Sequence, residues 1–369
     1  MIVPLRLLFR PLAVLCLLLA LGSCAHVNPY FDARLAHHRP GGFQNRHIEF
    51  TPRSGWDLLR WRWQAWRAGV PSAPARPTPT TAPDLDFIHR NARAGDAMQP
   101  AATWIGHATM LLQFGGRTVI TDPMFSERAS PFSFVGPQRA QPPGVALHDL
   151  PRIDLVLVSH DHYDHLDEPS VRALQAQAGG PPLFVAPLGV GAWLRARGIT
   201  NVVELDWWQS HRDGDFEIVL TPAQHWSGRG LFDRMTTLWG GFAVFTPDFH
   251  VFYSGETGYS PDFRAIAERF AERQRDGGFD LALLPVGAYE PRWFMREQHV
   301  NPEEAVQIHE DVRARHSIGV HWGTFELTDE ALDEPPAALA HARAARGLVE
   351  QAFRVLAVGQ TVPLPRRSR

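Results

Sequence analysis

The segment from His160 to His165 carries three histidines and an aspartate within six positions, in the order His-x-His-x-Asp-His. It follows directly on the apolar run 153–158, which has the composition of a buried strand. Imidazole nitrogen and carboxylate oxygen are both ligands for zinc-like ions. Side chains two positions apart in an extended segment point the same way, so His160 and His162 can hold one ion. Asp164 and His165 then face a second position, and the motif predicts a site for two metal ions.

A polar, solvated turn rich in histidine is the alternative interpretation of this segment. The dense spacing directly after a buried strand favours metal binding. The motif resembles that of the metallo-β-lactamase superfamily, whose hydrolases carry it after a core strand. The resemblance implies a fold of the α/β class, an αβ/βα sandwich of two mixed β-sheets flanked by helices.

Length and composition are those of a globular protein. The chain has 369 residues, of which 44% are hydrophobic and 20% charged, and its formal net charge is -3. Such a chain can bury a large core, in one large domain or two. A nucleic-acid partner would require a basic surface, so the charge predicts no binding to nucleic acid. The oligomeric state is not defined by the sequence.

Residues 1–24 are predicted to be a lipoprotein signal peptide that lies outside the fold. The apolar run 12–21 is followed by Leu21-Gly22-Ser23-Cys24, which resembles a bacterial lipobox. The resemblance implies a lipid on Cys24 that anchors the chain to the membrane of the cell envelope. Ala25 at the next position favours the periplasmic face of the outer membrane over the inner membrane. A conventional cleaved signal peptide and an uncleaved anchor are the alternatives.

The two cysteines bear on the metal ligands as well. Cys16 and Cys24 are the only cysteines, and both belong to the predicted signal. A mature chain that begins at Cys24 would therefore have no disulfide and no thiolate available as a metal ligand.

Residues 25–99 are predicted to be an N-terminal extension, and residues 100–369 the catalytic domain. Within the extension, the Pro-rich segment 71–83 is predicted to be a semi-rigid linker or a surface strap. A stretch of the extension has tryptophan and leucine at helical spacing, interleaved with arginine; it comprises Arg53, Trp56, Leu59, Arg60, Arg62, Trp63, Trp66 and Arg67. Tryptophan and arginine suit a membrane interface. The alternative is a helix that packs its tryptophan face on the catalytic domain. Trp61 lies on the opposite face and blurs the amphipathic pattern, which favours packing.

Short β patterns and helical patterns alternate after residue 100. Strands are predicted at 103–105, 110–114, 118–120, 155–158, 183–186, 216–221, 241–245, 250–254 and 281–285. Helices are predicted at 169–176, 190–197, 261–275, 302–315 and 330–345. This order predicts sheets covered by helices.

Two metal ions need more ligands than one motif offers. His225 and His321 each follow an apolar run, and each alone would more often be a structural histidine. In their order and spacing they match ligands of the superfamily. The resemblance implies that His160, His162 and His225 hold one zinc ion and that Asp164, His165 and His321 hold the other.

Glu256 departs from the superfamily pattern, because an aspartate normally stands at this position and bridges both metals. The additional methylene of glutamate changes the reach of the carboxylate. Ligation with altered spacing is expected, and a single-metal centre or a different preferred ion is the alternative.

Longer tracts resemble one branch of the superfamily. They cover residues 104–109, 122–131, 135–137, 160–167, 298–305 and 321–325. The branch is the N-acyl-phosphatidylethanolamine-hydrolysing phospholipase D family. The resemblance implies a zinc-dependent phosphodiesterase that cleaves (N-acyl) phosphatidylethanolamine or related phospholipids by attack of a metal-activated hydroxide on phosphorus.

The same resemblance assigns catalytic roles. Asp164 and Glu256 would orient the water and relay its proton, and Tyr163 and His299 would contact phosphate or assist the leaving group. Packing roles are the alternative for Tyr163 and His299. For the whole chain, the alternatives are a metallohydrolase of lactones or nucleotide phosphodiesters, and a non-catalytic metal-binding envelope lipoprotein.

Overall fold

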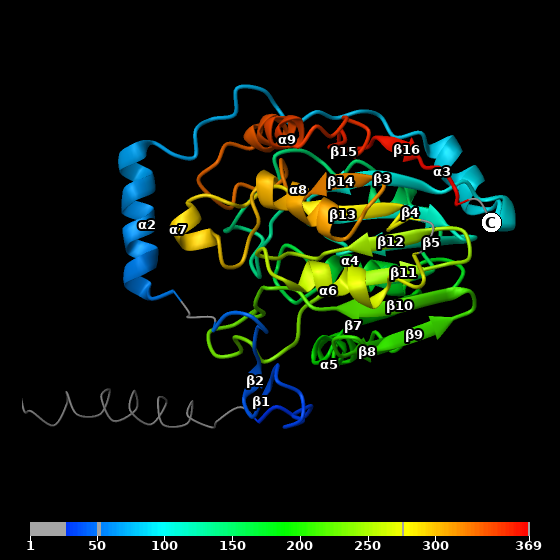
Figure 1. The fold of residues 1–369 in the computed structure, drawn as a ribbon, viewed down its shortest axis with the longest axis horizontal. Coiled ribbons are helices and arrows are strands. Elements are labelled where there is room, and N and C mark those ends of the chain that lie inside the picture. The colour runs from blue at the N-terminus through cyan, green and yellow to red at the C-terminus, as the bar shows by residue number, and fades with distance from the viewer. Residues whose placement is uncertain (1–26, 50–52, 275–276, 368–369) are drawn as a thin grey trace, which may run out of the picture.

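Two seven-stranded sheets face each other in the computed structural model, which describes residues 27–49, 53–274 and 277–367 (Figure 1). The first sheet contains, in spatial order, β16 (Thr361–Pro363), β3 (Ala101–Gly106), β4 (Thr109–Phe114), β5 (Arg117–Thr121), β6 (Leu155–Leu157), β7 (Leu183–Pro187) and β8 (Val202–Leu205). The second contains β15 (Phe353–Arg354), β14 (Ser317–Val320), β13 (Leu281–Pro285), β12 (His250–Tyr253), β11 (Gly241–Phe245), β10 (Phe216–Thr221) and β9 (Ser210–Asp213). The predicted αβ/βα sandwich of mixed sheets is confirmed.

Each face of the first sheet belongs to a different hydrophobic cluster. In β6, Leu155 and Leu157 point into the core between the sheets, and Val156 points to the outer face, as the alternation of a strand requires. The outer face is covered by α3 (Leu85–Ala92), α4 (Glu168–Gln175) and α5 (Val190–Arg195). Helices α6 (Asp262–Arg269), α8 (Pro302–Asp311) and α9 (Glu334–Ala345) contribute to the cluster around the second sheet. The short 3-10 helices are η2 (Gly95–Ala97) and η3 (Leu147–Asp149).

Strand direction determines where the site forms. β5, β6 and β7 are parallel in the first sheet, and β12, β13 and β14 are parallel in the second. β3 is antiparallel to β4, which is antiparallel to β5, so β3 and β5 run in the same direction. In the same way, β10 and β12 run in the same direction on either side of β11. The carboxyl ends of these strands therefore gather the loops that follow them along one edge of each sheet.

Helix α6 is shorter than predicted. It ends at Arg269 and not at residue 275, because Phe270 leaves the helix and is buried between Phe245 and Phe279. Helix α8 begins where the sequence places it. Asn301 and Glu304 form a capping box there, with Pro302 in the first turn.

The N-terminal extension runs over the sandwich as a strap. It comprises the two-stranded β1 (His38–Arg39) and β2 (Gly42–Phe43), followed by α2 (Gly55–Ala68). After α2, the Thr78 hydroxyl donates to the Gly323 carbonyl at 2.6 Å, and Thr81 N–H donates to the Val358 carbonyl at 2.8 Å. The segment 71–83 is thus a bound strap, which is one of the two predicted roles.

The predicted packing of the tryptophan face of α2 is wrong. Trp56, Trp63 and Trp66 are 80%, 53% and 77% exposed. Trp61 is the buried tryptophan of this helix, and it packs on Phe294 of α7 (Arg292–Met295) with ring centroids 4.8 Å apart. The narrow face formed by Trp61 and Ala65 packs on α7, so the wider apolar stripe stays outside.

Among the described residues, no helix is long and apolar enough to cross a membrane. The division of the chain at residues 24 and 99 stays a prediction, and Cys24 lies outside the described residues.

Candidate metal centre

Loops from both sheets bring histidines and carboxylates together. The turn between β3 and β4 supplies His107, the loop after β5 supplies Asp122, and the loop after β6 supplies the motif 160–165. From the second sheet, the loops after β10, β12 and β14 supply His225, Glu256 and His321. Eight of these side chains form two adjoining groups, and the ligand atoms within each group lie within 4.8 Å of one another. Asp122 belongs to neither and forms a further group with His160 and His165.

The first group contains His160, His162, His225 and Glu256. Nε2 of His160 lies 2.8 Å from Nδ1 of His162, which in turn lies 3.3 Å from Nε2 of His225. Oε2 of Glu256 is 3.0 Å from His225 Nε2 and 3.3 Å from His160 Nε2. The three predicted histidine ligands therefore converge on one point.

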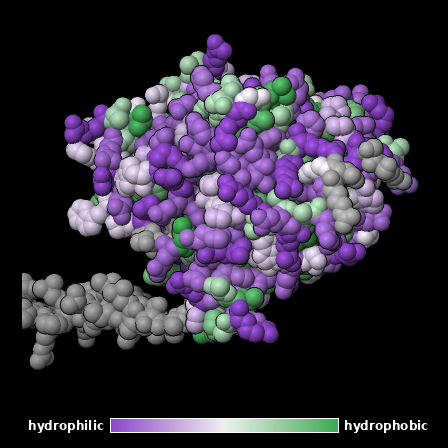
Figure 2. Space-filling view, in the orientation of Figure 1, coloured by the Kyte–Doolittle hydropathy of each residue, from purple (hydrophilic) through white to green (hydrophobic). Residues whose placement is uncertain are grey.

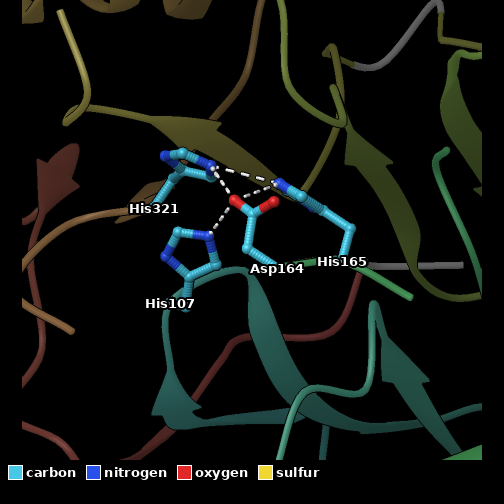
Figure 3. A group of neighbouring side chains, drawn as sticks. All are labelled: His107, Asp164, His165 and His321. Carbon is cyan, nitrogen blue, oxygen red and sulfur yellow. Dashed lines mark hydrogen bonds and ion pairs between the residues drawn. The ribbon is translucent and has the colours of Figure 1, made fainter. Parts of the chain in front are cut away.

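The second group contains His107, Asp164, His165 and His321 (Figure 3). Oδ2 of Asp164 lies 2.9 Å from Nε2 of His107 and 3.4 Å from Nε2 of both His165 and His321. The nitrogens of His165 and His321 are 3.1 Å apart. Figure 3 shows His107 and His321 on the same side of the Asp164 carboxylate, with His165 across from them.

Glu256 lies between the two groups and contacts both. Its Oε2 is 3.3 Å from His165 Nε2 as well as close to the first group, and its Oε1 is 2.9 Å from His321 Nε2. The side chain is almost fully buried. The longer glutamate therefore reaches the position between the groups that a bridging carboxylate needs.

Hydrogen bonds behind the ligands orient the imidazole rings. Nδ1 of His165 is 2.6 Å from Asp122 Oδ2, and Nδ1 of His225 is 2.9 Å from the Gln298 carbonyl. Nδ1 of His160 is 2.9 Å from the Ser159 hydroxyl. Such partners fix the ring and its tautomer, as is usual for histidines that bind metal.

The backbone is strained at three of these positions. His107, Asp122 and His321 have positive φ angles of 51°, 32° and 62°, a region that non-glycine residues rarely adopt. Strain of this kind, on the order of 1–3 kcal/mol per residue, collects at functional sites. Before Glu256, Gly255 has φ 64°, and an added Cβ would lie 2.6 Å from the Gly240 carbonyl oxygen. Glycine is therefore required at this turn.

The carboxylates at the centre are held as anions. Burial would raise the pKa of Glu256, but His321, His299 and His225 outweigh burial and hold that pKa well below its usual range. The same holds for the pKa of Asp164, where His165 and His107 oppose burial. Burial would lower the pKa of His321, yet the Glu256 carboxylate raises it to about 9.

Burial would also lower the pKa of His165, but the carboxylates of Asp164 and Asp122 raise it well above its usual value. His225 and His107 are instead held neutral. Burial lowers the pKa of His225 to about 4 and that of His107 to about 3. A bound cation would take the place of the protons on the charged histidines, so that metal binding here releases protons.

The donor set fits metal ions. Imidazole nitrogens that approach one another to 2.8–3.3 Å need a proton or a cation between their lone pairs, and a metal ion can take that position. The groups offer only nitrogen and oxygen donors, four in each group, as zinc and similar ions prefer. All but His162 and Asp164 are buried, which shields the centre from solvent.

Two predicted catalytic residues differ in their placement. His299 lies at the centre, with Nδ1 2.9 Å from Glu256 Oε1. Tyr163 joins neither group. Its ring lies under the Arg229 guanidinium at 3.9 Å, and it lines a neighbouring cavity of about 990 Å³ together with Asp161, Trp193 and Arg229.

Asp122 and His107 are absent from the ligands predicted from the sequence, and the structure brings both to the centre. For Asp122 the available signal is a carboxylate directly after a strand that neighbours the motif strand. His107 shares Asp164 with His165 and His321, so the structure adds it to the second group.

Comparison with known proteins agrees with this geometry. The model of the β-lactamase superfamily domain matches residues 117–322, which is more than half of the chain and includes every predicted metal ligand. The chain belongs to the β-lactamase superfamily. It is a metallo-hydrolase of that superfamily, with histidine and carboxylate groups able to bind metal.

Individual relatives of this superfamily member include characterised and uncharacterised proteins. It is 44% identical over 278 residues to an uncharacterized protein of Mycobacterium tuberculosis, covering 74% of this chain and 70% of that protein. It is also 44% identical over 245 residues to the N-acyl-phosphatidylethanolamine-hydrolyzing phospholipase D 1 of Caenorhabditis elegans, covering 63% of this chain and 67% of that protein.

A solved structure shows the same fold. The isothiocyanate hydrolase from Delia radicum gut bacteria superposes with a TM-score of 0.55 at 21% identity, covering 71% of this chain and 98% of that one. At this level of identity, the likeness concerns the fold alone.

Proposed function

We propose that this superfamily member is a zinc-dependent phosphodiesterase of the phospholipase D type, which hydrolyses phosphatidylethanolamine, its N-acyl form or a related phospholipid. The observation that carries the proposal is the position of Glu256, whose carboxylate contacts histidines of both ligand groups. Two ligand groups that share a carboxylate suit a pair of metal ions, and such pairs assist displacement at phosphorus. The identity to the Caenorhabditis elegans phospholipase D supports the choice of a phospholipid.

Bound zinc would supply Lewis-acid activation of water and neutralise charge on the phosphoryl oxygens. The chain's own residues then orient the reactants. Glu256 engages Nδ1 of His299, which leaves the other ring nitrogen to exchange a proton with the substrate. Asp164 stays ionised against three imidazoles and holds the second group together.

The cavity beside the motif offers room for part of a lipid. Tyr163 and Asp161 line it from the motif loop, and Trp193 and Phe132 add apolar surface. None of the side chains of the two ligand groups lines this cavity. The cavity therefore suits a part of the lipid next to the phosphodiester, and Tyr163 lies between this cavity and the metal centre.

The test is hydrolysis by the purified full chain. Phosphatidylethanolamine and N-acyl-phosphatidylethanolamine are supplied in mixed micelles, and release of phosphatidic acid is measured with and without added zinc. We expect phosphatidic acid from at least one of the two lipids, and its loss in His225→Ala. Turnover of a lactone or a cyclic nucleotide, with neither phospholipid cleaved, would overturn the proposal.

We further propose that the chain is a lipoprotein of the cell envelope, held through Cys24 at the periplasmic face of the outer membrane. The lipobox-like order Leu21-Gly22-Ser23-Cys24 supports this. Metabolic labelling with palmitate should mark the wild type and Cys16→Ala, and should not mark Cys24→Ala. Labelling that survives in Cys24→Ala would contradict the anchor.

A further inference from the structure

Helix α2 presents two faces of different character. Trp61 and Ala65, four positions apart, are buried against Phe294 and Met295 of α7. The Trp61 indole N–H also donates to Asp329 Oδ1 at 2.8 Å. The opposite face carries a stripe that we call the tryptophan stripe. It consists of Trp56, Leu59, Trp63 and Trp66, all between 53% and 80% exposed.

Arginines border the tryptophan stripe on both sides. At about 100° of rotation per residue, Arg60 and Arg67 fall along one border and Arg62 along the other. The Arg67 guanidinium lies 4.9 Å from the centre of the Trp63 ring, and that of Arg60 lies 4.9 Å from the Trp293 ring. Asp57, which caps the helix start, is the only acidic residue of α2, so the face is basic in a chain whose net charge is -3.

The tryptophan stripe is too apolar for a surface that contacts only water. Three exposed indoles on one stripe leave apolar surface that a partner must cover. Indole rings lie at the level of lipid headgroups, where their apolar bodies reach the acyl boundary and their N–H groups stay hydrated. Guanidinium groups beside them meet the phosphates of anionic lipids.

We propose that α2 is an interfacial helix that lies on an anionic phospholipid membrane through its tryptophan stripe and flanking arginines. The stripe supplies the apolar contact and the arginines the attraction to phosphate. The role of this contact, which is to bring the enzyme to its substrate, rests on the proposed function. The contact itself does not, because α2 can bind lipid without turnover.

The position of α2 links it to the metal centre. Helix α7, on which Trp61 packs, follows β13 and precedes His299, whose ring contacts Glu256. Arg53, just before α2, is 3.5 Å from Glu297 in the same loop. Figure 1 shows α2 standing at the outside of α7, at the end of the sandwich where this loop lies. In the same view, Figure 2 shows hydrophilic residues mixed with pale ones of intermediate hydropathy along that rim. A membrane held by α2 would thus lie beside the loop that carries His299.

The test uses quenching of tryptophan fluorescence by brominated lipids. The purified full chain is added to vesicles of phosphatidylethanolamine and phosphatidylglycerol with brominated acyl chains, and binding is verified by flotation. No tryptophan precedes Trp56, so the predicted anchor contributes no signal. We expect strong quenching of the wild type and of the control Trp208→Phe. The triple variant Trp56→Ser, Trp63→Ser, Trp66→Ser should lose most of it.

A second variant tests the arginines. Replacing Arg60, Arg62 and Arg67 by glutamine should reduce quenching on these vesicles and remove its dependence on salt. Equal quenching in the wild type and the tryptophan variant, with both bound to vesicles, would overturn the inference. A dimer in the wild type that the tryptophan variant loses would also overturn it, because the stripe would then cover a second copy. Phospholipid turnover is measured separately, so failure of α2 to touch lipid and failure of the phosphodiesterase proposal give different results.

Discussion

The carboxylate of Asp122 lies 2.6 Å from Nδ1 of His165, and both side chains are fully buried. The same oxygen accepts hydrogen bonds from the hydroxyls of Ser159 and Tyr253, each at 2.5 Å. His165 therefore faces the second ligand group with its Nε2, while its Nδ1 proton is held by an anion that has three partners. Asp122 thus sets the orientation and tautomer of a predicted metal ligand from behind its ring.

Asp122→Asn should weaken metal binding at the second group by about 10- to 100-fold, since partners of this kind tune affinity by that amount. The amide would place a donor against two hydroxyls and an imidazole N–H. Zinc titration in a competition assay measures the change. Tyr253→Phe is the matched control, because it removes one hydrogen bond and keeps the carboxylate. Equal affinity in wild type and Asp122→Asn would show that His165 is not a ligand.

Glu256→Gln should reduce the metal content from about two ions per chain to about one or fewer, because a bridging position needs a charged carboxylate. Elemental analysis of the purified chain gives the content directly. Glu256→Asp keeps the charge and shortens the side chain, and the contacts at 2.9–3.3 Å predict that it also lowers occupancy. Higher occupancy in Glu256→Asp would instead show that glutamate weakens this centre.

His299→Ala should leave the metal content unchanged, because His299 contacts Glu256 and belongs to neither ligand group. Loss of a proton-transfer group should lower kcat by about 10²- to 10⁴-fold. The measurement is phospholipid turnover at saturating zinc, with elemental analysis on the same sample. Loss of metal in His299→Ala would indicate that His299 is a metal ligand. An unchanged kcat would indicate that His299 has only a packing role.

Asp206→Asn should destabilise the fold by about 1–3 kcal/mol, because a buried acceptor of two imidazole N–H groups is lost. His38 Nδ1 accepts the Asp32 N–H, so its Nε2 carries the proton that is donated to Asp206 at 2.9 Å. His37 lies 2.6 Å from the other oxygen of the same carboxylate. Unfolding in urea measures the loss. Asp32→Asn, at an exposed pair with Arg34, should change stability less.

Acidification should act on the same contact. Burial would raise the pKa of Asp206, but the hydrogen bond and charge of His37 outweigh it and lower that pKa. A lowered pKa in the folded state means that the stabilisation is present above the ordinary value near 4 and disappears as the pH falls through the folded value. The difference in unfolding free energy between wild type and Asp206→Asn should therefore shrink below about pH 4.

The sequence predicted most of the side chains that converge at the centre, because they follow strands and because the motif is dense. His160, His162, His165, His225 and His321 are recognisable without knowledge of which strands pair. Asp122 is different, since its partnership with His165 depends on β5 lying beside β6. Strand neighbours are a property of the fold, and local pattern does not define them.

The faces of α2 show a second limit of sequence reasoning. A helical pattern indicates which residues share a face, and the apolar face was expected inside. The buried face is instead chosen by one contact, Trp61 with Phe294 and Asp329, between residues more than 200 positions apart. The helix itself was predicted correctly, and its orientation was not.

Ligands from both sheets meet at Glu256, and this has a consequence for assembly. His107, Asp164 and the motif histidines come from the first sheet, while His225, Glu256 and His321 come from the second. A cation at this centre would be a cross-link between two layers whose contributing residues span more than half of the chain. The affinity for that cation therefore depends on how stably the two sheets pack together at this edge. Removal of the cation by a chelator should loosen the packing of the sheets at this edge first.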